Sequence, residues 1–186
     1  MEIKEYEHRG KWLQTYTGRA FFVADPRSED FSVVDIAHAL ANQCRFTGHT
    51  KRFYSVAQHC VLASRIVPPE DAGWGLLHDA TEAYLCDIAR PVKCQLSNYR
   101  SIEQKLMIRI AEHFDLPYVE PDSIAVADLV LLATERRDLM GTPPMPLHPS
   151  EQVRPLSDPI SPLCPMAAEK AFLARFRELF PQYQIQ

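Results

Sequence analysis

The chain has 186 residues, of which 46% are hydrophobic and 24% are charged. A chain of this size favours one domain, residues 1–186, whose core needs no disulfide or structural metal. The net charge is −4, and the 20 Lys and Arg residues form no long run. A nucleic-acid polymer is therefore excluded as the expected partner, because stable binding to its phosphates needs a basic stripe.

Membrane and redox features narrow the class of protein further. No stretch approaches 18 apolar residues, and the chain begins Met1-Glu2-Ile3 without an apolar leader segment. The five cysteines are an odd number and include no C-x-x-C pair, which argues against a zinc ribbon or a redox motif. We therefore expect a soluble, cytoplasmic protein with reduced cysteines and no membrane partner.

The first elements in chain order are extended. Residues 11–24 are rich in β-prone side chains and carry Gly18 in the middle. This pattern predicts a short β-hairpin or two extended pieces, in an extension that covers residues 1–30. The Pro- and Asp-containing segment 25–30 ends it.

From residue 32 onward, apolar residues recur at helical spacing. The predicted helices cover residues 32–41, 55–67, 70–85, 101–113 and 123–139. Ser32 or Asp35 can cap the first of them, and Pro91 marks the exit from the third. His78 and Asp79 are then expected near the middle of the third helix, about 100° apart around its axis.

The C-terminal part contains a Pro-rich strap and one more predicted helix. Eight prolines between residues 141 and 165 forbid regular helix there and predict a strap that runs over the domain. The last helix covers residues 166–180 and places Phe172 and Phe176 on one apolar face. The expected fold class is mainly α, a helical bundle with a small N-terminal β-hairpin.

Four side chains form a candidate metal site. His59 lies on the inward stripe of one predicted helix, His78 and Asp79 lie on the next, and Asp128 lies within an apolar run of a third. Burying several such polar groups around one point is costly unless a cation is bound. Glu82 lies one turn after Asp79 and projects from the same side.

Each of these residues also has a purely structural interpretation. A single His on an apolar helix face is commonly a hydrogen-bonded core residue. Asp128 could pair with Arg136 or Arg137, and Asp79 and Glu82 could belong to a solvated face. The opposite charges of Glu135-Arg136-Arg137-Asp138 predict local salt bridges. The agreement among two His and two Asp on three helices favours the metal site.

The order His59, His78-Asp79, Asp128 resembles the H…HD…D signature of the HD-domain metal-dependent phosphohydrolases. The segment from His78 to Ala83, with Asp87-Ile88 and Pro91-Val92-Lys93, is similar to bacterial 5′-deoxynucleotidases and phage dATP triphosphohydrolases of that superfamily. The resemblance covers roughly residues 40–140 and implies an HD-domain helical bundle. A second Lys shortly before the last Asp, typical of the phage enzymes, is absent here.

The resemblance also implies roles for individual residues. His59, His78, Asp79 and Asp128 would bind the metal. Glu82, with Asp79 and Lys93, would be catalytic, and Glu82 would orient or deprotonate the attacking water. Arg45 and Lys93 would hold phosphate, Phe46 would wall in the nucleoside, and Asp87 would hydrogen-bond the sugar.

The expected function is metal-dependent hydrolysis of a (deoxy)nucleoside phosphate, with a 5′-nucleotidase as the leading hypothesis. The expected cofactor is one divalent transition metal (Mn, Co, Ni, Fe or Zn), because two nitrogen and two oxygen ligands suit these ions. The alternatives are a dNTP triphosphohydrolase and, in another class, a nucleotide-binding sensor without turnover. The partner is a small-molecule nucleotide, and a homo-oligomer is compatible with the resemblance.

Overall fold

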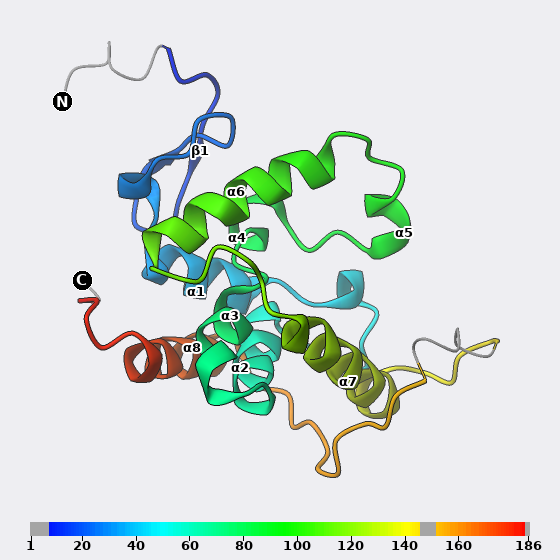
Figure 1. Cartoon of the computed structure of the whole chain (residues 1–186). Coiled ribbons are helices and arrows are strands. Elements are labelled where there is room, and N and C mark those ends of the chain that lie inside the picture. Colours follow the sequence, from blue (N-terminus) through cyan, green and yellow to red (C-terminus); the bar gives the residue numbers. More distant parts are fainter. Residues whose placement is uncertain (1–7, 146–151, 185–186) are drawn as a thin grey trace.

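A computed structural model describes residues 8–145 and 152–184 (Figure 1). The first paired element is an antiparallel hairpin of β1 (Leu13–Gln14) and β2 (Ala20–Phe21), in which Leu13 lies opposite Phe21. The hairpin predicted within residues 11–24 is therefore confirmed. Arg9 fixes it to the following turn through ion pairs with Asp25 and the buried Asp30.

The rest of the described chain is mainly helical, as predicted. The helices are α1 (Val33–Asn42), α2 (Val56–Ile66), α3 (Ala72–Leu77), α4 (Glu82–Leu85), α5 (Arg90–Lys93), α6 (Tyr99–His113), α7 (Asp122–Leu139) and α8 (Pro165–Leu179). Ser55 caps α2, since its hydroxyl accepts a hydrogen bond from the Gln58 N–H at 3.1 Å. None of the helices in the described ranges is long and apolar enough to cross a membrane.

The hydrophobic core lies around α2, which packs against α1, α3, α7 and α8. The terminal helix α8 contributes Phe172 and Phe176, and both side chains are fully buried. Gly75 permits a very close approach of α3 to α2, because a Cβ atom there would lie 2.8 Å from the Ser64 Cα. The core thus fixes the relative position of the two elements that carry the predicted histidine ligands.

The predicted continuous helix over residues 70–85 is wrong. The chain forms α3, then tight turns with i→i+3 hydrogen bonds from Leu77 to Thr81, and then the short helix α4. The Gly75 carbonyl accepts a hydrogen bond from the His78 ring at 3.0 Å. In a regular helix the Asp79 N–H would donate to that carbonyl instead. A polar contact of the candidate site therefore takes the place of the helical hydrogen bond.

Two further expectations concern prolines. Pro91 does not end a helix but lies in the first turn of α5, where a missing N–H costs nothing. The described parts of the Pro-rich strap (141–145 and 152–164) contain no regular helix, as predicted. Residues 146–151 of the strap lie outside the described residues. The segment 152–164, orange in Figure 1, follows the C-terminal end of α7 and leads to α8.

Candidate metal centre

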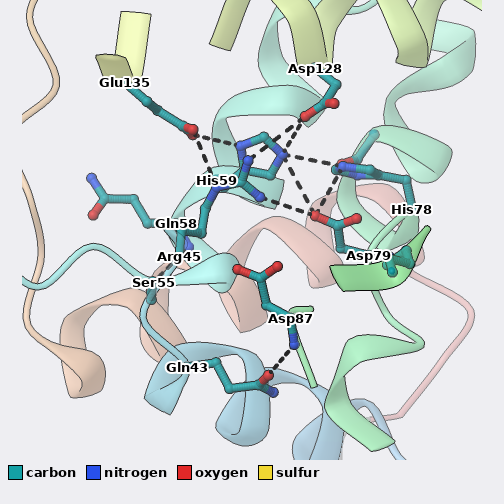
Figure 2. Close-up of polar contacts among 12 residues, drawn as sticks. Gln43, Arg45, Ser55, Gln58, His59, His78, Asp79, Asp87, Asp128 and Glu135 are labelled. Carbon is teal, nitrogen blue, oxygen red and sulfur yellow. Dashed lines mark hydrogen bonds and ion pairs between the residues drawn. The ribbon is translucent and has the colours of Figure 1, made fainter. Parts of the chain in front are cut away.

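Four side chains converge at one point between α2, α7 and the turns after α3 (Figure 2). The Nε2 atoms of His59 and His78 lie 3.3 Å apart. Asp79 Oδ2 lies 3.7 Å from His59 Nε2 and 3.3 Å from His78 Nε2. Asp128 Oδ1 lies 3.4 Å from His59 Nε2. We call these four residues the His/Asp centre.

The spacing of these donor atoms fits one ion. Ligand bonds of about 2.1 Å place neighbouring donors about 3.0 Å apart in octahedral and about 3.4 Å apart in tetrahedral geometry. The donor atoms of His59, His78 and Asp128 also all lie within 4.8 Å of one another. The structure brings these residues and Asp79 together at one point, and the group could hold a metal ion.

Hydrogen bonds to the other ring nitrogens orient both histidines. His59 Nδ1 lies 2.7 Å from Glu135 Oε1, and His78 Nδ1 lies 3.0 Å from the Gly75 carbonyl oxygen. Both oxygens accept hydrogen bonds, so each Nδ1 carries the proton in the neutral ring. The two Nε2 lone pairs then face the same point, which is the arrangement of metal-binding histidines.

Glu135 is the functional residue that the sequence analysis missed. It was assigned to local salt bridges on α7, but its side chain is fully buried against His59. Its other oxygen lies 3.3 Å from Arg45 Nε. The available signal was the spacing, because Glu135 follows Asp128 by seven residues and so lies on the same side of the helix. The neighbouring Arg137 and Asp138 do form the predicted local salt bridge.

Arg45 lies among carboxylates at the edge of the His/Asp centre. Its guanidinium is 3.3 Å from Glu135, 3.5 Å from Asp79 and 3.9 Å from Asp128. Burial lowers the pKa of Arg45, but these three carboxylates outweigh it and raise the pKa above its ordinary value. Arg45 is thus charged and balances part of the negative charge of the site.

The same charges act on the ligands. Burial and Arg45 lower the pKa of His59, whereas Glu135 and Asp128 raise it more strongly, to about 9. Burial raises the pKa of Asp128, but the His59 hydrogen bond and charge lower it further, below its ordinary value. Among the protein groups alone, the negative potential of the centre is therefore strong enough to hold a proton on His59, as it would hold a cation.

Glu82 lies beside the centre in an unusual environment. Its side chain is buried, and within the described residues its Oε2 atom has no hydrogen-bond partner. Burial and the charge of Asp79 raise the pKa of Glu82 well above its ordinary value. The Gln43 side chain, which donates to the Glu82 carbonyl at 3.0 Å and accepts from the Asp87 N–H at 3.0 Å, fixes the two segments that carry these carboxylates.

A cavity of about 470 Å³ opens onto the His/Asp centre. Its lining includes every predicted substrate residue, namely Arg45, Phe46, Asp87 and Lys93. It also includes three further cations, Arg90, Arg100 and Arg136. Lys93 donates to Glu103 at 2.7 Å, so this cation is held at the cavity wall by a carboxylate. The cavity therefore joins the predicted metal site to a wall that carries five cations and four carboxylates.

A second cavity, of about 370 Å³, reaches the centre from the side of α6. Asp79, Lys93 and Arg100 line both cavities, whereas Glu103 and Glu120 line only the second. The centre thus lies where two cavities meet.

These observations define a mainly helical protein with a His/Asp centre that could hold a metal ion, beside a cavity whose wall includes five cations. The chain is 42% identical over 170 residues to the uncharacterized protein YfdR of Escherichia coli K12, which covers 90% of this chain and 95% of that protein. It is 33% identical over 144 residues to an uncharacterized protein of Rhodobacter capsulatus, covering 70% of this chain and 74% of the relative. The chain therefore belongs to the family of these proteins. No protein-family profile matches it.

Proposed function

We propose that the protein is a metal-dependent phosphohydrolase of the HD type that acts on nucleoside phosphates, with a 5′-nucleotidase activity as the leading candidate. The observation that carries the proposal is the convergence of His59, His78, Asp79 and Asp128 at the mouth of a cationic cavity. The resemblance of the motif segments to HD phosphohydrolases supplies the substrate class.

The four residues of the His/Asp centre would hold one divalent ion, and Mn, Co, Ni, Fe or Zn suit the two nitrogen and two oxygen donors. Such an ion, when bound, polarises a phosphoryl oxygen and lowers the pKa of a coordinated water. Glu135 keeps the His59 ring in the orientation that presents Nε2 to the ion.

The remaining residues bind and position the substrate. Lys93 and Arg45, at the cavity wall, neutralise charge on the phosphoryl group. Glu82, buried between the centre and the cavity, orients the attacking water and accepts its proton. Phe46 provides an apolar wall for the nucleoside, and Asp87 provides a hydrogen-bond acceptor for the sugar.

A dNTP triphosphohydrolase is the second candidate. The observation that favours it is the number of cations on the cavity wall, because Arg90, Arg100 and Arg136 add to Arg45 and Lys93. A polyphosphate carries more charge than a monophosphate and benefits more from such a wall.

The test is phosphate release by the Mn²⁺-loaded protein from a panel of dNMPs, NMPs and dNTPs. We expect orthophosphate from monophosphates, with the rate lost in Glu82→Gln and His59→Ala. Lys105→Ala, which removes an exposed cation of α6 outside both cavities, is the matched control for Lys93→Ala. Triphosphate release from a dNTP would establish the second candidate. Nucleotide binding without any product would replace both with a sensor that does not turn over its ligand.

A further inference from the structure

A buried thiol lies next to the His/Asp centre. Cys60 follows His59 on α2, and its side chain is fully buried. The donor atoms of Cys60, His78 and Asp79 all lie within 4.8 Å of one another. This is a second group of potential ligands, and it shares two members with the His/Asp centre while replacing His59 and Asp128 by sulfur.

Carboxylates lie around the buried Cys60 sulfur. Burial and the charges of Asp79 and Glu82 raise the pKa of the Cys60 thiol well above its ordinary value, so the sulfur becomes a thiolate only when a cation replaces its proton. The charge of Asp79 also raises the pKa of Glu82. Its Oε2 atom is buried and has no hydrogen-bond partner in residues 8–145 and 152–184. This oxygen is available to a cation or to a water bound to it.

We propose that a thiophilic divalent ion binds at a second position in this centre, held by Cys60, His78 and Asp79. Thiolate ligands select soft and borderline ions such as Zn²⁺, whereas carboxylates suit harder ions such as Mn²⁺. The thiol proton leaves to solvent when the sulfur coordinates the ion. Because His78 and Asp79 belong to both positions, an ion at the second position excludes one at the first.

The proposal depends on the donor geometry and not on the proposed hydrolysis. It predicts that Cd²⁺ or Zn²⁺ displaces Mn²⁺ from the protein and binds at the position that includes the Cys60 sulfur. The direct probe is Cd²⁺, because a cadmium–thiolate bond gives a charge-transfer absorption in the ultraviolet. The exposed thiols of Cys86, Cys94 and Cys164 are first alkylated in the folded protein, which leaves the buried Cys60 unmodified.

In this experiment the alkylated wild type is titrated with Cd²⁺ and compared with Cys60→Ala and Cys44→Ala. The matched control is Cys44→Ala, since the half-buried Cys44 belongs to neither ligand group. We expect the absorption in the wild type and in Cys44→Ala, its suppression by saturating Mn²⁺, and its loss in Cys60→Ala. Cd²⁺ affinity should fall by at least about tenfold in Cys60→Ala, the smallest loss seen even for outer partners of ligands.

Two results would overturn the proposal. One is displacement of Mn²⁺ by Cd²⁺ in the wild type without thiolate absorption. The other is an absorption of equal size in a folded Cys60→Ala variant. Since the wild-type measurement with Mn²⁺ competition is decisive alone, the proposal can fail even if Cys60→Ala does not fold. Mn²⁺ binding measured in the same titration reports separately on the His/Asp centre.

Discussion

At the scale of single residues, Glu135 contacts both His59 and Arg45. One of its oxygens accepts a hydrogen bond from His59 Nδ1, and the other accepts one from Arg45 Nε. A buried carboxylate with two such partners orients both of them, because neither partner can move without leaving a charge unpaired. We therefore expect the proposed metal affinity of the His/Asp centre to depend on Glu135, which is not one of the four proposed ligands.

Replacing this carboxylate tests that dependence. In Glu135→Gln we expect Mn²⁺ affinity to fall by about 10–100-fold, as is usual when the outer partner of a histidine ligand is lost. Isothermal titration calorimetry measures the affinity, and circular dichroism checks the fold. The control is Glu112→Gln, which removes an exposed carboxylate of α6 that pairs with Arg109. Equal affinities in the two variants would contradict the role of Glu135.

The sequence predicted the four residues of the His/Asp centre but not this partner. His59, His78, Asp79 and Asp128 are polar residues on apolar stripes, and that contrast is visible in one dimension. Glu135 lies beside Arg136, Arg137 and Asp138, so local charge pairing explained it equally well. Its partner His59 is 76 positions away, and only the packing of α7 on α2 brings the two together.

At the scale of elements, the break between α3 and α4 positions His78 and Asp79 in the His/Asp centre. The sequence from residue 70 to 85 has the composition of one helix, and local propensity alone predicts it. The long-range contacts of His78 with His59 and of Asp79 with Arg45 accompany the local His78–Gly75 hydrogen bond and outweigh that propensity. The contacts with His59 and Arg45 lie outside any local sequence window, which is why the predicted helix was wrong there.

Gly75 makes this geometry possible, because its missing side chain lets α3 approach the backbone of Ser64. We expect Gly75→Ala to lower the free energy of unfolding by about 1–3 kcal/mol through overpacking. It should also weaken metal binding, because the Gly75 carbonyl holds His78. Urea denaturation measures the first effect. The control is Gly141→Ala, where a Cβ has no neighbour within 4 Å and stability should change little.

The Pro-rich strap is hydrogen-bonded to α2 and α7, the helices that carry His59 and Glu135. The Gln58 side chain donates to the Ser161 carbonyl at 2.8 Å and accepts from the Leu163 N–H at 2.8 Å. The Thr134 hydroxyl accepts from the Leu156 N–H at 3.0 Å. Gln58 precedes His59 and Thr134 precedes Glu135, so the strap fixes the backbone beside both members of this pair.

Removing the Gln58 hydrogen bonds to the strap should lower the stability of the protein. In Gln58→Ala the backbone groups of Ser161 and Leu163 lose their partner, and we expect a loss of about 1–3 kcal/mol in the free energy of unfolding. Proteolysis should also cleave the strap faster. An exposed glutamine of α6, Gln104, provides the matched alanine control. Unchanged stability and cleavage in Gln58→Ala would show that the strap is held elsewhere.

At the scale of the whole molecule, we expect binding of the proposed ion to be linked to folding. The ligands come from α2, the turns after α3 and α7, so the complete centre exists only in the folded chain. At a Mn²⁺ concentration of about 100 times Kd, the folded state gains about 2.7 kcal/mol. For a protein of this size, the melting temperature should rise by roughly 5–11 °C.

Differential scanning fluorimetry tests this link. A chelator should reverse the rise, and His59→Ala should show little of it. Exposed carboxylates that bind Mn²⁺ nonspecifically would raise the melting temperature of His59→Ala as much as that of the wild type. That outcome would argue against a specific centre.

The order of these elements along the chain also has a consequence for synthesis. His59, His78 and Asp79 leave the ribosome well before Asp128 and Glu135, and the core around α2 stays uncovered until α8 supplies Phe172 and Phe176. A nascent chain thus exposes His59, His78 and the Cys60 thiol before Asp128 and Glu135 have been synthesised. The complete set of proposed ligands therefore forms only late in synthesis, and we expect metal loading of newly made protein to follow translation as a separate step.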